Sequence, residues 1–312
     1  MLPAMSDARR ARLGLVGAAV LFSTGGAAIK ATALSSWQVA GLRSAVAALA
    51  LVALLPEARR GYSPRAALVA VAYAATLVLF VTSNKLTTSA SAIFLQDTAP
   101  FYVLLLGPLL LRERVRPADL GLMAVIAAGM AMFFLGADAP MRTAPAPLRG
   151  NVLAACSGVA WALTLVGLRW MGAGGAGAPL AAVVLGNLLA ALVCLPWALP
   201  LAGARAADLG AVAYLGVVQI GLAYLLVTRA MRHVPAFEAS LLLLVEPALN
   251  PVWTWAVHGE RPGPWTLAGG VLIIGATAAR AFIDARLAAP PAVTSDRATP
   301  ASPAPLARPP TR

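Results

Sequence analysis

Ten long apolar stretches, separated by short polar connections, make up most of the chain. Each is close to the roughly 20 residues that an α-helix needs to cross a hydrocarbon core of about 30 Å. Backbone groups in lipid must hydrogen-bond within their own segment, so helices are the expected structure. The predicted spans are 12–31, 37–55, 65–83, 88–111, 117–136, 149–170, 178–199, 209–231, 236–258 and 264–284. The pattern therefore predicts an all-α integral membrane protein with ten transmembrane helices.

Three segments fall outside these spans. Residues 1–11 form a basic N-terminus, and we interpret the apolar stretch after it as an uncleaved first helix rather than a signal peptide, because many spans follow. Residues 137–148 are a Pro-rich linker, and 287–312 contain too few apolar residues to bury, which predicts a disordered tail.

Composition supports a membrane protein. Hydrophobic residues are 60% of the chain, charged residues only 12%, and the mean hydropathy is +0.80. The formal charge of +12 is scattered between apolar runs, so we expect membrane lipid rather than nucleic acid as the surrounding partner. Cys156 and Cys194 lie inside apolar runs, and His233 and His258 are isolated, so no metal site and no cofactor are predicted.

The distribution of positive charge predicts the orientation. Most of the 24 Lys and Arg residues fall on one side of the membrane if the N-terminus is inside. We therefore expect an inner-membrane protein with both termini in the cytoplasm.

The chain contains an internal repeat. A shift of 147 residues aligns 92–117 with 239–264, so that Pro100 meets Pro247 and Glu113 meets Glu260. With small gaps, Lys30 meets Arg169 at the end of the first span of each copy. Residues 12–136 and 149–286 thus form two copies of five spans, and an odd number of spans inverts the second copy in the membrane. Inverted repeats are typical of transporters that work by alternating access.

These residues resemble the EamA-type exporters of the drug/metabolite transporter superfamily. The resemblance covers roughly residues 10–285 and rests on the twice-repeated Pro–apolar–Glu pattern and on Arg43 in the second span. It implies secondary active transport of amino acids or similar small metabolites and drugs through a cavity between the repeats. A lipid-moving or regulatory membrane protein on the same scaffold is the alternative, since a fold does not determine a function. An enzyme is not predicted, because no cluster of His, Asp or Cys is visible near one interface.

Two acids lie deep within predicted spans. A carboxylate at the centre of a spanning helix costs about 2.5–3.5 kcal/mol on insertion scales, so such residues usually face protein or water. Glu246 and Asp97 stand close to Pro247 and Pro100, which are expected to kink their helices and free backbone carbonyls. Burial favours a neutral carboxyl and a nearby guanidinium favours the ionised form, so either acid could exchange a proton. The alternative role is a buried partner that holds two helices together.

Arg43 lies about six residues inside the outer edge of its span. A guanidinium binds a carboxylate through two parallel hydrogen bonds, so Arg43 could hold an anionic or zwitterionic substrate. An ion pair with Asp97 or Glu246 is the equal alternative. Mid-span amides and aromatic residues complete the predicted pathway for a small-molecule substrate. The alternative role is hydrogen bonding between helices for the amides, and ordinary packing or anchoring at the membrane interface for the aromatic residues. The set comprises Gln96, Asn187, Gln219, Asn250, Tyr102, Trp161, Tyr224 and Trp253.

Six further residues are predicted to be structural. We expect the carboxylate of Glu113 or Glu260 to stabilise the start of the helix that follows it, where the helix dipole is positive. The set comprises Pro100, Pro247, Glu113, Glu260, Lys30 and Arg169.

Overall fold

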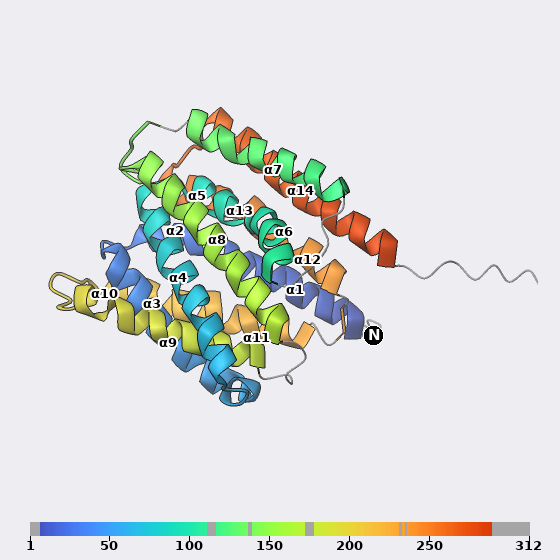
Figure 1. The fold of residues 1–312 in the computed structure, drawn as a ribbon. Coiled ribbons are helices and arrows are strands. Elements are labelled where there is room, and N and C mark those ends of the chain that lie inside the picture. The colour runs from blue at the N-terminus through green and yellow to red at the C-terminus, as the bar shows by residue number, and fades with distance from the viewer. Residues whose placement is uncertain are drawn as a thin grey trace, which may run out of the picture.

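The computed structural model describes residues 7–110, 117–136, 139–171, 178–230, 233–234 and 236–288. These residues are almost entirely helical, and their only extended pairing is an isolated bridge between Met141 and Ala144. Figure 1 shows the helices as one bundle in which most axes run in similar directions.

The first half of the chain folds into five spans, two of which are interrupted. Ser35 and Ser63 begin the second and third spans, because their hydroxyls accept hydrogen bonds from the backbone N–H groups of Gln38 and Ala66. The elements are α1 (Asp7–Ser23), α2 (Gly25–Ala31), α3 (Ser36–Leu54), η1 (Pro56–Arg59), α4 (Pro64–Leu86), α5 (Ser89–Gln96), α6 (Ala99–Leu110) and α7 (Pro117–Leu135).

The second half repeats this arrangement with its own interruptions. One span contains a stretch of π-helix, named η2, and the next is divided in two. The elements are α8 (Pro147–Met171), α9 (Ala178–Ala198), α10 (Ala206–Ala213), η2 (Tyr214–Leu222), α11 (Ala223–Ala230), α12 (Ala236–Leu243), α13 (Val245–His258) and α14 (Pro264–Ala288).

The helices coincide with the predicted spans. Among the described residues, eight helical segments are long and apolar enough to cross a membrane. Of the other two predicted spans, 117–136 holds a shorter apolar helix and 236–258 is divided at Leu244. Large apolar side chains on the outside of the bundle, such as Leu49, Leu109 and Val271, are more than half exposed, as expected for lipid-facing positions.

The two repeats pack against each other through equivalent helices. α3 packs on α9, α7 on α14, and α5 on α13, while α1 packs on α11 as α4 packs on α8. The directions are inverted: Thr87 at the end of α4 contacts Asn151 near the start of α8, and Arg65 at the start of α4 stacks on Trp170 near the end of α8. The structure thus confirms two inverted repeats.

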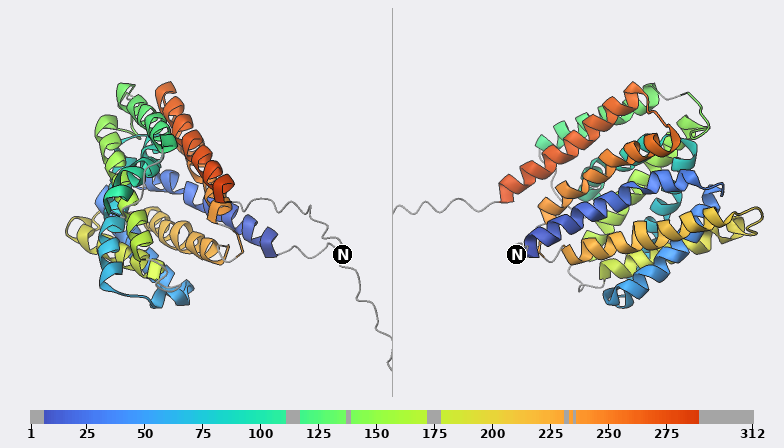
Figure 2. Two further views of the ribbon diagram at one scale, coloured as in Figure 1. Left: turned by 45° about the vertical axis from the view of Figure 1, so that its right-hand side comes forward. Right: turned by 180° about the vertical axis from the view of Figure 1, so that it is seen from behind.

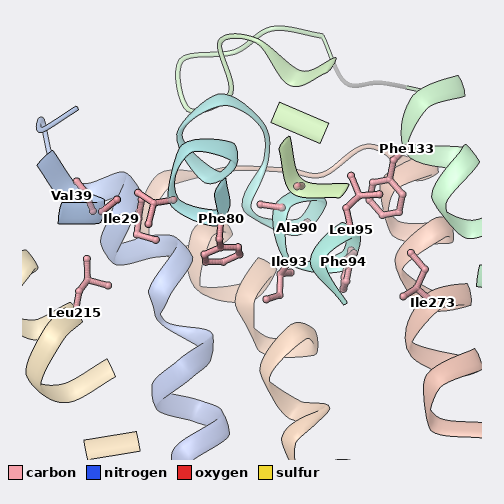
Figure 3. Packing of buried hydrophobic residues seen from close by; sticks show 14 of the residues in the cluster. Ile29, Val39, Phe80, Ala90, Ile93, Phe94, Leu95, Phe133, Leu215 and Ile273 are labelled. Atoms are coloured by element: carbon pink, nitrogen blue, oxygen red, sulfur yellow. The ribbon is translucent and has the colours of Figure 1, made fainter. Parts of the chain in front are cut away.

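A hydrophobic core fills one half of the bundle. Figure 3 shows Ile29, Phe80, Phe94, Phe133 and Ile273, which come from five different helices, within this core. The rings of Phe94 and Phe133 meet edge to face at 6.3 Å between centroids. The core therefore joins the first repeat to α14 of the second.

The bundle has two distinct ends. Both views in Figure 2 place the start of α1 and the end of α14 on the same side of the molecule, which we call the termini end. Glu238 lies at this end because it pairs with Arg12 near the start of α1, and η1, which contains Glu57, follows α3 where the chain has returned toward this end. The opposite end, where α2 ends and α5 begins, contains Lys30, Ser89 and Glu260, and we call it the closed end.

Candidate substrate cavity

A cavity of about 330 Å³ lies near the middle of the bundle, between the two repeats. Its lining comes from α1, α3, α4, α5, α8, η2, α11, α12 and α13, with Asp97 from the junction after α5. Seven predicted pathway residues line it: Arg43, Gln96, Asp97, Trp161, Gln219, Tyr224 and Glu246.

Interrupted helices place the two acids. α5 ends at Gln96 and α6 begins at Ala99, so Asp97 lies at a break in the fourth span. The ninth span breaks at Leu244, which the 147-residue repeat aligns with Asp97, and Glu246 lies in the first turn of α13. The two repeats therefore each supply one carboxylate from nearly the same position.

The prolines begin new helices instead of kinking continuous ones. Pro100 and Pro247 occupy the first turns of α6 and α13, where the missing N–H would have no helical partner. The predicted kink is thus replaced by a break just before each proline. Gln219 lies within the π-helical stretch η2, and such stretches are frequent at functional sites.

Arg43 is a buried basic residue on the wall of this cavity. It is only 3% exposed, and its Nε has no hydrogen-bond partner in the part of the chain that the structure describes. Within the same residues no ion pair joins it to Asp97 or Glu246. Asp97 and Glu246 line the same cavity as Arg43. One basic and two acidic side chains thus face one space.

Aromatic residues occupy the region between these charges. The hydroxyls of Tyr73 and Tyr224 lie 3.1 Å apart, and Tyr73 packs against Trp161 with 6.2 Å between ring centroids. Phe22 meets Tyr224 edge to face at 5.6 Å. The sequence analysis missed Phe22, Tyr73 and Thr76, because an aromatic residue or a threonine within a span is typical of ordinary packing.

Four predicted pathway residues do not line this cavity. Asn187 is fully buried, and its amide donates to the carbonyl of Val183. Asn250 accepts a hydrogen bond from Ser89, and the Trp253 indole donates to Ser23. Tyr102 packs edge to face with its neighbour Phe101. Asn250 thus forms a hydrogen bond between helices, which is the alternative role considered for the amides, whereas the Asn187 amide bonds within its own helix.

Lys30 and Glu260 join the two repeats at the closed end. Lys30 Nζ lies 3.0 Å from Glu260 Oε2, and both side chains are at most 2% exposed. Lys30 also donates to the carbonyls of Thr87 and Thr143, while Glu260 Oε1 accepts from the backbone N–H of Ser89 at 2.6 Å. Glu260 therefore accepts a hydrogen bond at the start of α5, a helix of the other repeat, as well as standing shortly before α14.

The other predicted structural residues lie outside what the structure describes. This applies to Glu113 and to the side chain of Arg169. At the closed end the close approach of helices also depends on Gly26, where a Cβ atom would collide with Ser89 and Asn250.

A second cavity, of about 460 Å³, adjoins the first and extends to the termini end. Tyr73, Trp161, Tyr224 and Val227 line both cavities, so the two adjoin at these four side chains. Glu57, in η1 at the termini end, lies on the lining of the second. Phe80 and Ile93 belong both to the first cavity and to the hydrophobic core, which therefore blocks the route toward the closed end.

A helical membrane protein with two inverted repeats around a polar cavity has the architecture of a secondary transporter. The model of the EamA-like transporter family matches residues 9–135 and 148–279, and the chain belongs to this family. A solved structure titled "Crystal structure of protein" is similar in fold, with a TM-score of 0.59 and 21% identity over 89% of this chain and 99% of that chain. A comparison with curated proteins finds no match.

Proposed function

We propose that this protein is a secondary active transporter that exports small zwitterionic metabolites, such as amino acids, across the inner membrane by alternating access. The observation that supports this most is the pairing of an unneutralised Arg43 with the acids Asp97 and Glu246 around one buried cavity. Buried charges are costly unless they are paired, so such an arrangement favours a ligand that carries both signs of charge.

The substrate would complete the electrostatics of the cavity. Its carboxylate would accept hydrogen bonds from the Arg43 guanidinium, and its ammonium group would lie against Asp97 and Glu246. Tyr73 and Tyr224 supply hydroxyls between these two positions. A neutral solute would leave the Arg43 guanidinium without an acceptor.

The acid pair also provides a route to energy coupling. Asp97 and Glu246 line one cavity, and two like charges in such a space would repel each other, which would favour a state in which at least one carboxyl group holds a proton. Arrival of an ammonium group would favour release of that proton, because the cation stabilises the ionised acid. Export would then be coupled to proton movement in the opposite direction.

The proposed orientation places the termini end in the cytoplasm. In that orientation the second cavity opens inward near Glu57, while Lys30 and Glu260 close the outer side. The structure would then represent the inward-facing state, in which an exporter receives its substrate.

A counterflow screen in reconstituted vesicles tests this function. Vesicles loaded with unlabelled amino acids are supplied with the labelled forms, with and without a pH gradient. We expect exchange of at least one zwitterionic amino acid, and faster net movement when the gradient is imposed. Glu246→Gln should retain a folded, inserted protein but lose the response to the gradient.

Two outcomes would contradict the proposal. Absence of exchange for every amino acid would exclude the substrate class, and a Glu246→Gln variant that transports and responds to the gradient like the wild type would exclude proton coupling at Glu246. Gel filtration and circular dichroism of each variant provide the control for folding.

A further inference from the structure

The second cavity differs chemically from the first. Leu168, Leu180, Ala182 and Val183, from α8 and α9, line it together with Pro179 and Thr164. The Thr164 hydroxyl is already satisfied, since it donates to the carbonyl of Ala160 at 2.9 Å. Apart from Glu57 at its outer limit and the hydroxyl groups of Thr228, Tyr73 and Tyr224, its wall therefore offers apolar contact rather than charge.

The position of this cavity relates it to the charged one. The four shared residues, Tyr73, Trp161, Tyr224 and Val227, lie where the two spaces meet, and three of them are aromatic. A ligand whose charged groups are held between Arg43 and the acids would have its remaining substituent beside these rings. With about 460 Å³, the second cavity is large enough for a bulky side chain.

We infer that the second cavity binds the side chain of the substrate, so that the transporter selects zwitterions with a large apolar side chain, aliphatic or aromatic. This inference rests on the proposed function, since it needs the zwitterion to occupy the first cavity. Burying each methylene group against an apolar wall makes the free energy of binding more favourable, whereas a polar side chain loses its hydrogen bonds to water there. Leucine and phenylalanine should therefore be preferred over alanine, glycine and serine.

The competing interpretation is that the second cavity is only an entrance. Glu57 at the termini end is consistent with solute passing through this space. An entrance would restrict all substrates alike, whereas a side-chain compartment would restrict only the large ones. The two interpretations therefore predict different effects when the cavity is filled.

Val183→Phe fills the compartment from α9. Val183 is 6% exposed and lines the second cavity but not the first. Counterflow is measured with labelled leucine, phenylalanine and alanine for the wild type and the variant. We expect the wild type to exchange leucine and phenylalanine at least about tenfold faster than alanine. The variant should lose most of that preference while retaining alanine exchange.

Two further variants keep the test informative. Leu192→Phe adds bulk to the same helix at a residue that is 65% exposed, and it should leave the preference unchanged. Val183→Leu adds a single methylene group and should lower the preference for large side chains to a smaller extent. It replaces Val183→Phe in the test if that variant fails to fold.

The results distinguish this inference from the proposed function. If amino acids are exchanged without preference for large apolar side chains, or if Val183→Phe slows all of them equally, the side-chain compartment is excluded and zwitterion transport stands. If no amino acid is exchanged at all, the proposed function fails, and the inference fails with it.

Discussion

At the scale of single residues, the buried side chain of Arg43 is expected to lower the free energy of unfolding. Its side chain is buried at 3% exposure, and its Nε finds no acceptor among the described residues. A buried donor without an acceptor costs about 1–3 kcal/mol. In the proposed function, the carboxylate of the substrate supplies this acceptor.

Arg43→Met should therefore separate stability from transport. We expect the free energy of unfolding in detergent to rise by up to about 1–3 kcal/mol, because an unsatisfied charge is replaced by an apolar side chain of similar length. Amino-acid exchange should fall by about tenfold or more, since a charge-assisted hydrogen bond is worth about 1.5–3 kcal/mol.

Arg43→Lys is the matched control for this prediction. It retains the charge but lacks the two-pronged geometry of a guanidinium, so an intermediate loss of exchange is expected. If Arg43→Met destabilises the protein and leaves exchange unchanged, Arg43 is a structural residue and does not bind substrate.

Single residues differed in how well the sequence predicted them. Asp97 and Glu246 were found because an acid within an apolar span is costly and therefore informative. Tyr73 was missed, although its hydroxyl lies 3.1 Å from that of Tyr224, because aromatic residues in spans commonly serve as packing. Whether an aromatic residue lines the cavity or only packs depends on the direction in which its side chain points. The spacing of residues along a span does not predict that direction when both faces of the helix are apolar.

At the scale of elements, breaks in helices position the acidic residues that line the cavity. The fourth and ninth spans divide at equivalent positions, next to Asp97 and Glu246, and the eighth contains the π-helical stretch η2 beside Gln219. Backbone groups released at such breaks are tolerated in a membrane only where protein or water surrounds them. We therefore expect such breaks in the interior of the bundle, and they lie beside the first cavity.

Elements from the two repeats are joined by Lys30 and Glu260. Glu260→Gln leaves an amide oxygen for the Ser89 N–H but removes the counterion of a buried ammonium group. Removing one partner of a buried ion pair costs about 3–5 kcal/mol. We expect a loss near the lower value, because Thr87 and Thr143 carbonyls still accept from Lys30.

A double-mutant cycle measures the coupling of this pair. Lys30→Met combined with Glu260→Gln should recover much of the stability lost in the Glu260→Gln variant, when unfolding is followed by denaturant titration in detergent. Strictly additive losses would show that the two side chains do not stabilise each other.

At the scale of the whole molecule, the inverted repeats create two unlike ends. The closed end is tied by contacts between several spans, including Thr87 with Asn151 and Ser89 with Asn250. At the termini end the second cavity reaches Glu57. This asymmetry is what alternating access requires of any single state, because one side must be sealed while the other is open.

The proposed orientation is tested by cysteine accessibility in intact cells. With Cys156 and Cys194 replaced by serine, Tyr62→Cys near the termini end should react with a membrane-impermeant thiol reagent only after permeabilisation. Arg142→Cys, in the linker beyond α7, should react from outside without it. Both native side chains are exposed. The reverse labelling pattern would place both termini outside.

The sequence by itself determined the class, the spans and the repeat. A hydrophobic stretch of about 20 residues has the length to cross a bilayer as a helix, the structure that satisfies its backbone hydrogen bonds within the segment. The match between Pro100 and Pro247 indicates the duplication from the sequence alone. These are local or pairwise properties of the chain, so they can be read along it.

Only the tertiary structure decided which polar groups meet. It joins Glu260 to Lys30 and to the start of α5, leaves Arg43 apart from both acids, and adds Tyr73 to the cavity wall. These outcomes depend on the rotation and relative height of helices from different repeats, which are set by packing across the whole bundle. In a chain whose helices are apolar on nearly every face, the hydrophobic pattern carries little information about that rotation.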